Sequence, residues 1–145
     1  MTSRFRRRAI GGAVVAGVLL VSAAGCGESG PELIPVVGTV RIDGRPATEG
    51  AVTYRHASSG AFEASGLIQP DGTYKLMQNN QEGAQVGTYR IVVFVRKTPK
   101  TPTGEMAGLP AIIVNQKFTN PNTTPLSVDV KKDAPSGQYD LAVSR

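Results

Sequence analysis

The sequence has one cysteine (Cys26), one histidine (His56) and no tryptophan among its 145 residues. A single cysteine excludes an intramolecular disulfide and a zinc site built from several cysteines, and a single histidine excludes a multi-histidine metal centre. Charge is also sparse, because only 19% of the residues are charged. The chain is instead rich in turn formers, with 17 glycines and 10 prolines separating short runs of Val, Ile and Tyr. This composition favours one domain of short strands joined by tight turns.

The net charge of +5 comes mainly from the start of the chain. Residues 1–25 contain four arginines and no acidic residue, which leaves 12 Lys and Arg against 11 Asp and Glu in the rest. A strongly basic protein is a candidate for binding nucleic acid or anionic lipid. Because residues 26–145 are close to neutral, the sequence predicts no nucleic-acid partner.

Residues 1–25 have the parts of an export signal peptide. A basic segment at residues 4–8 precedes an apolar run at residues 9–21, which is shorter than the roughly 20 residues of a transmembrane helix. Small residues then lead to the cysteine. The sequence Ala-Ala-Gly-Cys at 23–26 resembles the lipobox of bacterial lipoproteins, with Ala23 where leucine is usual. This resemblance implies cleavage before Cys26 and acylation of its thiol and its new amino group.

Two alternatives to a lipoprotein signal remain open. An ordinary secretory signal with an incidental cysteine would leave the protein without a lipid, and the three arginines at 6–8 loosely match a twin-arginine signal. If Cys26 carries two or three acyl chains, it holds the protein firmly at a membrane, whereas one chain holds it marginally. Residues 26–35 then comprise the lipidated cysteine and a flexible spacer.

The residue after the cysteine bears on the location of the protein. Gly27 stands where some lipoproteins carry the aspartate that retains them in the inner membrane. We therefore expect an exported protein, anchored by lipid to the cell envelope at the outer membrane or the periplasmic face rather than the inner membrane.

Residues 36–145 are predicted to form one all-β domain, a seven-stranded β-sandwich. Alternating apolar residues mark the strands, turn residues separate them, and no stretch has a 3.6-residue repeat. The nearly continuous apolar run 89–95 predicts a central strand covered on both faces. The expected strands are residues 36–42, 51–55, 62–68, 73–77, 89–95, 126–130 and 139–143. The expected core is Val40, Val52, Tyr74, Leu76, Tyr89, Ile91, Val93, Leu126, Val128 and Leu141.

Two local features of this domain bear on function. Gly-x-Tyr ends at Tyr74, Tyr89 and Tyr139. We expect each glycine to adopt turn dihedrals and each tyrosine to bury its ring while its hydroxyl reaches a carbonyl, and an aromatic platform for sugars is the alternative. The longest connection, residues 96–125, is of the length that is often functional in compact domains. Within it, residues 111–114 predict an edge strand, and Phe118 a contact with the core.

The order of several motifs resembles a known family. They are Val-x-Gly-x-Val-x-x-Asp-Gly-x-Pro (36–46), Gly-Ala-Val (50–52), Asp-Gly-x-Tyr-x-Leu (71–76), Gly-Ala-x-x-Gly-x-Tyr (83–89) and, after Phe118, Asn-Pro-Asn-Thr-Thr-Pro-Leu (120–126). Together they resemble the small bacterial lipoproteins with a carboxypeptidase regulatory-like, or transthyretin-like, domain, which are numerous in planctomycetes. The resemblance covers residues 26–145 and implies a seven-stranded prealbumin-like sandwich. It implies little about activity, because a fold does not fix a function.

Candidates for catalysis are few. His56, Ser58, Ser59 and either Glu63 or Asp71 are the residue types of a nucleophile, a base and its orienting acid, but the chain has no Gly-x-Ser-x-Gly elbow. Transthyretin-like hydrolases need several histidines in the site, and zinc carboxypeptidases hold their metal in a separate domain. Asp43 and Asp71 lack the dense acidic spacing of a calcium loop, so turn formation explains them better. We expect a protein with no catalytic residues, no cofactor and no metal.

Two classes of function follow from these observations. The first is a structural or protein-interaction module, anchored at Cys26, which binds an envelope partner through the 96–125 connection or by strand addition at a sheet edge. The alternative is a carbohydrate-binding module for envelope glycan that uses Tyr54, Phe62 and Tyr74. The remaining candidate is one small basic patch, although we expect its side chains to be solvated. Its members are Lys97, Lys100, Lys131 and Lys132.

Overall fold

The structure, a computed structural model, describes residues 30–60 and 63–145. The export signal at residues 1–25 and the proposed lipidation site Cys26 lie outside the described residues, so both stay predictions. The described part of the chain is nearly all-β, as the sequence predicts, with strands β1 to β13 and one short 3-10 helix, η1 (Gln116–Thr119).

The larger sheet is built around β10 (Gly87–Lys97), the longest strand. One edge of β10 pairs with β4 (Gly50–His56), and the other edge pairs with β12 (Ser127–Val130) and then β11 (Ala111–Ile112). Beyond β4 the sheet continues with β5 (Glu63–Ile68), β7 (Met77–Gln78) and β8 (Gln81–Glu82). The central position predicted for residues 89–95 is therefore confirmed. The predicted cover on both faces is wrong, because Arg90 is exposed and Phe94 is half-buried on the outer face.

The smaller sheet is built around β2 (Val37–Ile42). Its neighbours are β13 (Leu141–Val143) on one edge and, on the other, β6 (Thr73–Lys75) and β3 (Arg45–Pro46). The pairing of β13 with β2 is parallel, whereas the other pairings are antiparallel. A two-stranded pair, β1 (Leu33–Ile34) with β9 (Ala84–Gln85), lies where the described chain begins.

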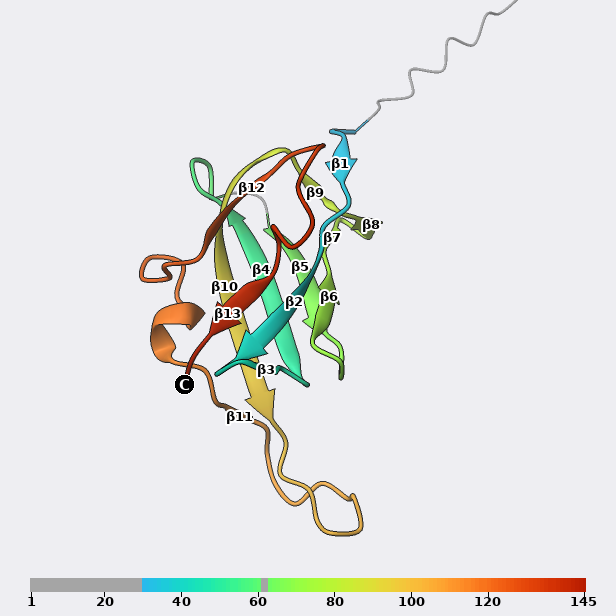
Figure 1. The fold of residues 1–145 in the computed structure, drawn as a ribbon, viewed down its shortest axis with the longest axis vertical. Coiled ribbons are helices and arrows are strands. Elements are labelled where there is room, and N and C mark those ends of the chain that lie inside the picture. The colour runs from blue at the N-terminus through green and yellow to red at the C-terminus, as the bar shows by residue number, and fades with distance from the viewer. Residues whose placement is uncertain (1–29, 61–62) are drawn as a thin grey trace, which may run out of the picture.

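The two sheets face each other across one core (Figure 1). Eight of the ten residues predicted for the core are buried, and the other two, Leu126 and Val128, are partly buried against it. Burial of these side chains is the main stabilising term for a domain of this size, since a chain with a single cysteine has no internal disulfide to add to it.

Each of the seven predicted strands has a counterpart, but the strand count differs, because one of them divides and five two-residue strands, β1, β3, β8, β9 and β11, are added. The segment predicted at 73–77 becomes β6 in the smaller sheet and β7 in the larger one. Leu76, at the break, has its side chain buried in the core. At this crossing β5 passes so close to β6 that a Cβ on Gly66 would collide with the carbonyl oxygen of Lys75. Only glycine fits there.

The two ends of the fold carry different segments of the chain (Figure 1). The chain enters beside β1 at one end, and the connection after β10 projects from the opposite end. The projecting residues 98–110 are called the arm below, and the end that carries them, with β3 and β11, is called the arm end.

Candidate functional site

All four tyrosines are buried. The hydroxyl of Tyr74 donates to the backbone oxygen of Tyr139 at 2.6 Å, and the hydroxyl of Tyr54 lies 2.8 Å from that of Tyr74. Since the single proton of Tyr74 is committed to the carbonyl, Tyr54 donates to Tyr74. Tyr89 donates to the backbone oxygen of Gln85 at 2.9 Å. The expectation of a buried ring with a carbonyl-bound hydroxyl is thus confirmed for Tyr74 and Tyr89, but for Tyr139 it is wrong, because its buried hydroxyl reaches no carbonyl among the described residues.

Burial also sets the ionisation of these tyrosines. Loss of hydration raises the pKa of Tyr54 and Tyr74 well above the free value of 10, and for Tyr74 the nearby Tyr54 adds to the rise. Burial raises the pKa of Tyr89 as well. The Tyr139 hydroxyl is buried and has no hydrogen-bond partner among the described residues. None of the four rings is available for stacking on a sugar, and Phe62 lies outside the described residues.

His56 closes a turn at the end of β4. Its Nδ1 lies 3.0 Å from the Ser58 hydroxyl oxygen, and the backbone amides of Ser58 and Ser59 point to the same nitrogen at 3.4 and 3.5 Å. Because amides only donate, Nδ1 is an acceptor and the neutral ring carries its proton on Nε2. The other face of the ring is tightly packed, since a Cβ on Gly87 would lie 2.6 Å from Nε2.

Among the described side chains, the His56 arrangement has a histidine and serines but no carboxylate. The pocket beside it, of about 410 Å³, is lined by serines, Arg55, Arg90 and Asn122. Asp71 is not part of this pocket, and the side chain of Glu63 is not described. His56 is thus held by the local amides of the turn and packs against the backbone at Gly87.

The aspartates considered for calcium are engaged in turns. Asp43 and Gly44 have φ values of 50° and 79°, which are the left-handed dihedrals of a tight hairpin turn. Asp71 accepts hydrogen bonds from the hydroxyl and the amide of Thr73, at 2.6 and 2.9 Å, and these bonds lower the pKa of its carboxyl. The described residues contain no group of three or more His, Cys, Asp or Glu able to hold a metal ion. The dihedrals of Asp43 and Gly44 and the hydrogen bonds of Asp71 confirm the turn interpretation.

The arm is an ordered hairpin rather than a structureless loop. Its base is held by pairing of β10 with β11 and by Glu49, whose carboxylate accepts from the Thr98 hydroxyl at 2.8 Å. Along its length the amide of Ala107 donates to the oxygen of Pro99, and the amide of Thr101 to that of Glu105, both at 2.8 Å. These bonds fix the backbone of a segment that contributes no residue to the core.

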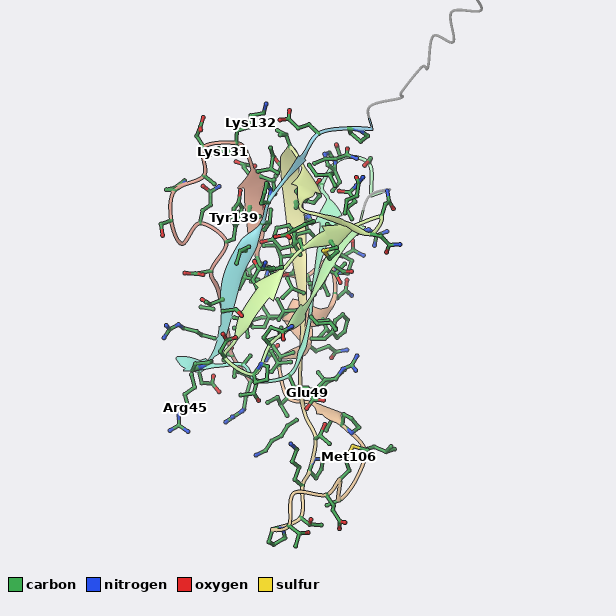
Figure 2. The ribbon with its side chains drawn as sticks, turned by 90° about the vertical axis from the view of Figure 1, so that its right-hand side faces the viewer. Arg45, Glu49, Met106, Lys131, Lys132 and Tyr139 are labelled. Atoms are coloured by element: carbon green, nitrogen blue, oxygen red, sulfur yellow. The ribbon has the colours of Figure 1, made fainter. Side chains whose placement is uncertain are left out.

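The arm and its base expose apolar side chains. The exposed fraction is 75% for Met106, 88% for Leu109 and 55% for Ile112. After Ile112 the chain returns to the body: η1 follows, and Phe118 is buried in the core. The edge strand and the Phe118 contact predicted from the sequence are both present. Figure 2 shows Met106 on the arm, with Glu49 at its base.

A pocket of about 430 Å³ opens beside the base of the arm, and we call it the arm-end pocket. It lies between the two sheets, where β3 and the ends of β2 and β10 meet. Its floor is apolar, and its rim is basic. The floor residues are Ile42, Ala47, Val95 and Ile113, and the basic residues are Arg45, Arg96, Lys97 and Arg145.

Sequence reasoning missed the arm-end pocket because its cations come from three distant segments. The available signal was the Arg-Lys pair that ends the central apolar run, together with Arg45 after the Asp-Gly turn. The four lysines considered as one basic patch do not form one. Lys97 and Lys100 belong to the arm end, whereas Lys131 and Lys132 lie at the opposite end (Figure 2), where Lys132 pairs with Glu32 at 2.8 Å.

Comparison with known proteins gives no match: no family model, no curated protein and no solved structure is similar to this chain. Within the described residues, no helix is both long and apolar enough to cross a membrane.

Proposed function

We propose that this chain is an exported, non-enzymatic protein, anchored by lipid at Cys26, whose β-sandwich binds a protein partner in the cell envelope through the arm. In this proposal the domain is of the carboxypeptidase regulatory-like, seven-stranded prealbumin-like kind. The observation that carries the proposal is the arm itself, because it is held rigid by backbone hydrogen bonds yet exposes Met106 and Leu109 to water.

Exposed apolar side chains on an ordered support are common in interaction surfaces, where contiguous apolar patches mark protein contacts. Pre-ordering of the arm reduces the entropy that binding would otherwise cost. The position of the arm agrees with an anchored protein, since it projects from the end opposite the one where the chain enters (Figure 1).

Envelope glycan is not favoured as the ligand. A sugar-binding platform needs an exposed aromatic ring, and the rings of Tyr54 and Tyr74 have no exposed surface. Catalysis lacks support as well, because among the described side chains no carboxylate lines the polar pocket at His56.

The interaction is tested in cells by site-specific photo-crosslinking. A photoreactive residue in place of Leu109 should give a discrete crosslinked protein band, and the same residue in place of Leu67, which is 71% exposed on β5, should not. A Met106→Ser and Leu109→Ser double variant carrying a crosslinker at Ile112 should lose the band while keeping its melting temperature. Equal bands at both sites, or a band insensitive to the double variant, would contradict the arm as the binding surface.

The anchor is tested separately by mass spectrometry of the mature protein. We expect an N-terminal Cys26 carrying acyl chains, and a Cys26→Ser variant that partitions into the aqueous phase after detergent extraction. A product that begins with Met1, or one that is free of lipid, would refute the anchor without bearing on the arm.

A further inference from the structure

The charges around the arm-end pocket are not balanced. Arg45, Arg96 and Lys97 form no ion pair within residues 30–60 and 63–145. Of the acidic residues nearby, Asp43 lines the pocket and lies 3.6 Å from the Arg145 guanidinium, whereas Glu49, which accepts the hydrogen bonds of Thr98, is not among the lining residues. Three cations thus line one cavity without an ion-pair partner among the described residues. Their mutual repulsion is relieved when an anion binds between them.

The chemistry of the rim selects the type of anion. Arginine guanidinium groups bind carboxylates and phosphates through paired hydrogen bonds, and Lys97 adds a third source of charge. The apolar floor restricts the type of ligand further. A small inorganic anion would leave Ile42, Val95 and Ile113 uncovered, whereas a ligand with an aliphatic group next to its anion covers the floor and pairs with the rim.

The neighbouring sheet edge favours a peptide over other amphiphilic anions. The strand β11 pairs with β10 and, within the described chain, with no strand on its other side. An extended peptide can add to such an edge through its backbone, and its alternate side chains then point to the same face. Ile113, which directly follows β11, lines the pocket, so a peptide along this edge passes beside the cavity.

We propose that the arm-end pocket binds an acidic, extended peptide segment of the partner protein, with a carboxylate against Arg96 and Lys97 and an aliphatic side chain on the apolar floor. This inference rests on the proposed function and names the chemistry of its partner. The arm and the pocket lie at the same end, so one partner contacts both.

The test uses the full chain extracted in detergent and a fluorescent peptide that alternates Glu and Leu. Anisotropy should show salt-sensitive binding, and the same peptide with Gln in place of Glu should bind at least about tenfold more weakly. The double variant Arg96→Gln and Lys97→Gln should weaken binding of the Glu peptide about tenfold or more. The matched control is Lys131→Gln and Lys132→Gln, which removes the same charge at the opposite end and should change binding less than about twofold.

Each other outcome counts against the proposal. Equal loss in the two double variants would mean non-specific attraction to net charge. Equal affinity for the Glu and Gln peptides would remove the role of the carboxylate. Tighter binding of polygalacturonate or of anionic lipid vesicles than of the peptide would replace the peptide with another ligand. If Arg96→Gln and Lys97→Gln leave the Leu109 crosslink in cells unchanged and do not affect peptide binding, the pocket proposal fails while the arm proposal stands.

Discussion

Replacing Tyr74 by phenylalanine should destabilise the domain more than the same change at any other tyrosine of the core. The hydroxyl of Tyr74 is the middle group of a chain of hydrogen bonds: it accepts from the Tyr54 hydroxyl and donates to the backbone oxygen of Tyr139. Phenylalanine keeps the ring and its packing, so only the two hydrogen bonds are lost. Both remaining partners are buried and would have no alternative partner.

The magnitude follows from the number of groups left unsatisfied. A buried donor or acceptor without a partner costs about 1–3 kcal/mol, so Tyr74→Phe, which leaves two such groups, should cost about 2–6 kcal/mol. Tyr54→Phe removes one donor and leaves Tyr74 still bonded to the carbonyl, so about 1 kcal/mol is expected. Tyr139→Phe removes a buried hydroxyl that has no partner within the described structure, and its free energy of unfolding should be unchanged or higher.

Urea unfolding at pH 7, followed by far-UV circular dichroism, measures all three variants. The urea midpoint should be lowest for Tyr74→Phe, intermediate for Tyr54→Phe, and at or above the parent for Tyr139→Phe, and the slope should stay constant. A larger effect at Tyr54 than at Tyr74 would refute the direction of the hydrogen-bond chain. A cost above about 1 kcal/mol for Tyr139→Phe would mean that this hydroxyl has a partner after all.

Three further predictions concern the same body. The free energy of unfolding should fall as pH rises above 10, because Tyr54 and Tyr74 ionise there in the unfolded chain, while their raised pKa keeps them neutral in the folded domain. Urea unfolding between pH 9 and 11 should show a loss that approaches about 1.4 kcal/mol per pH unit for each tyrosine. A free energy of unfolding that does not change over this range would contradict the prediction. Gly66→Ala should cost about 1–3 kcal/mol in urea through the clash with the Lys75 carbonyl, and an unchanged midpoint would mean that β6 moves freely. Phe118→Ala should cost about 3 kcal/mol by emptying a core site, and a melting temperature equal to the parent's would show that Phe118 is not part of the core.

The sequence predicts the parts of this fold that local chemistry decides. Asp43-Gly44 and Asp71-Gly72 form turns because their side chains and dihedrals suit turns wherever they occur. Apolar alternation identifies the strands and most of the core in the same way. It does not identify the sheet to which a strand belongs, because the pattern is the same in both sheets. The division of residues 73–77 between β6 and β7 depends on distant strands, and no local pattern of residues signals it.

The same distinction between local sequence and tertiary contacts decides which features of the candidate site could be predicted. The length of the 96–125 connection is enough to indicate the arm, and Phe118 is recognisable as an apolar residue in a polar segment. The order within the arm is not predictable in this way, because it comes from backbone bonds and from Glu49, which lies far away in the chain. The arm-end pocket is less predictable still, since Arg45 and Arg96 approach each other only after both sheets have formed.

The parallel pairing of β2 with β13 affects when the domain can fold. It joins Val40 to Leu141, and the carboxylate of Asp140 next to it accepts from the amide and hydroxyl of Thr39, at 2.8 and 2.9 Å. Contacts between such distant residues form slowly. While residues 139–143 are still being synthesised, one edge of β2 has no neighbour and the smaller sheet stays open. The topology thus delays completion of the domain until its last strand, β13, is available to pair with β2.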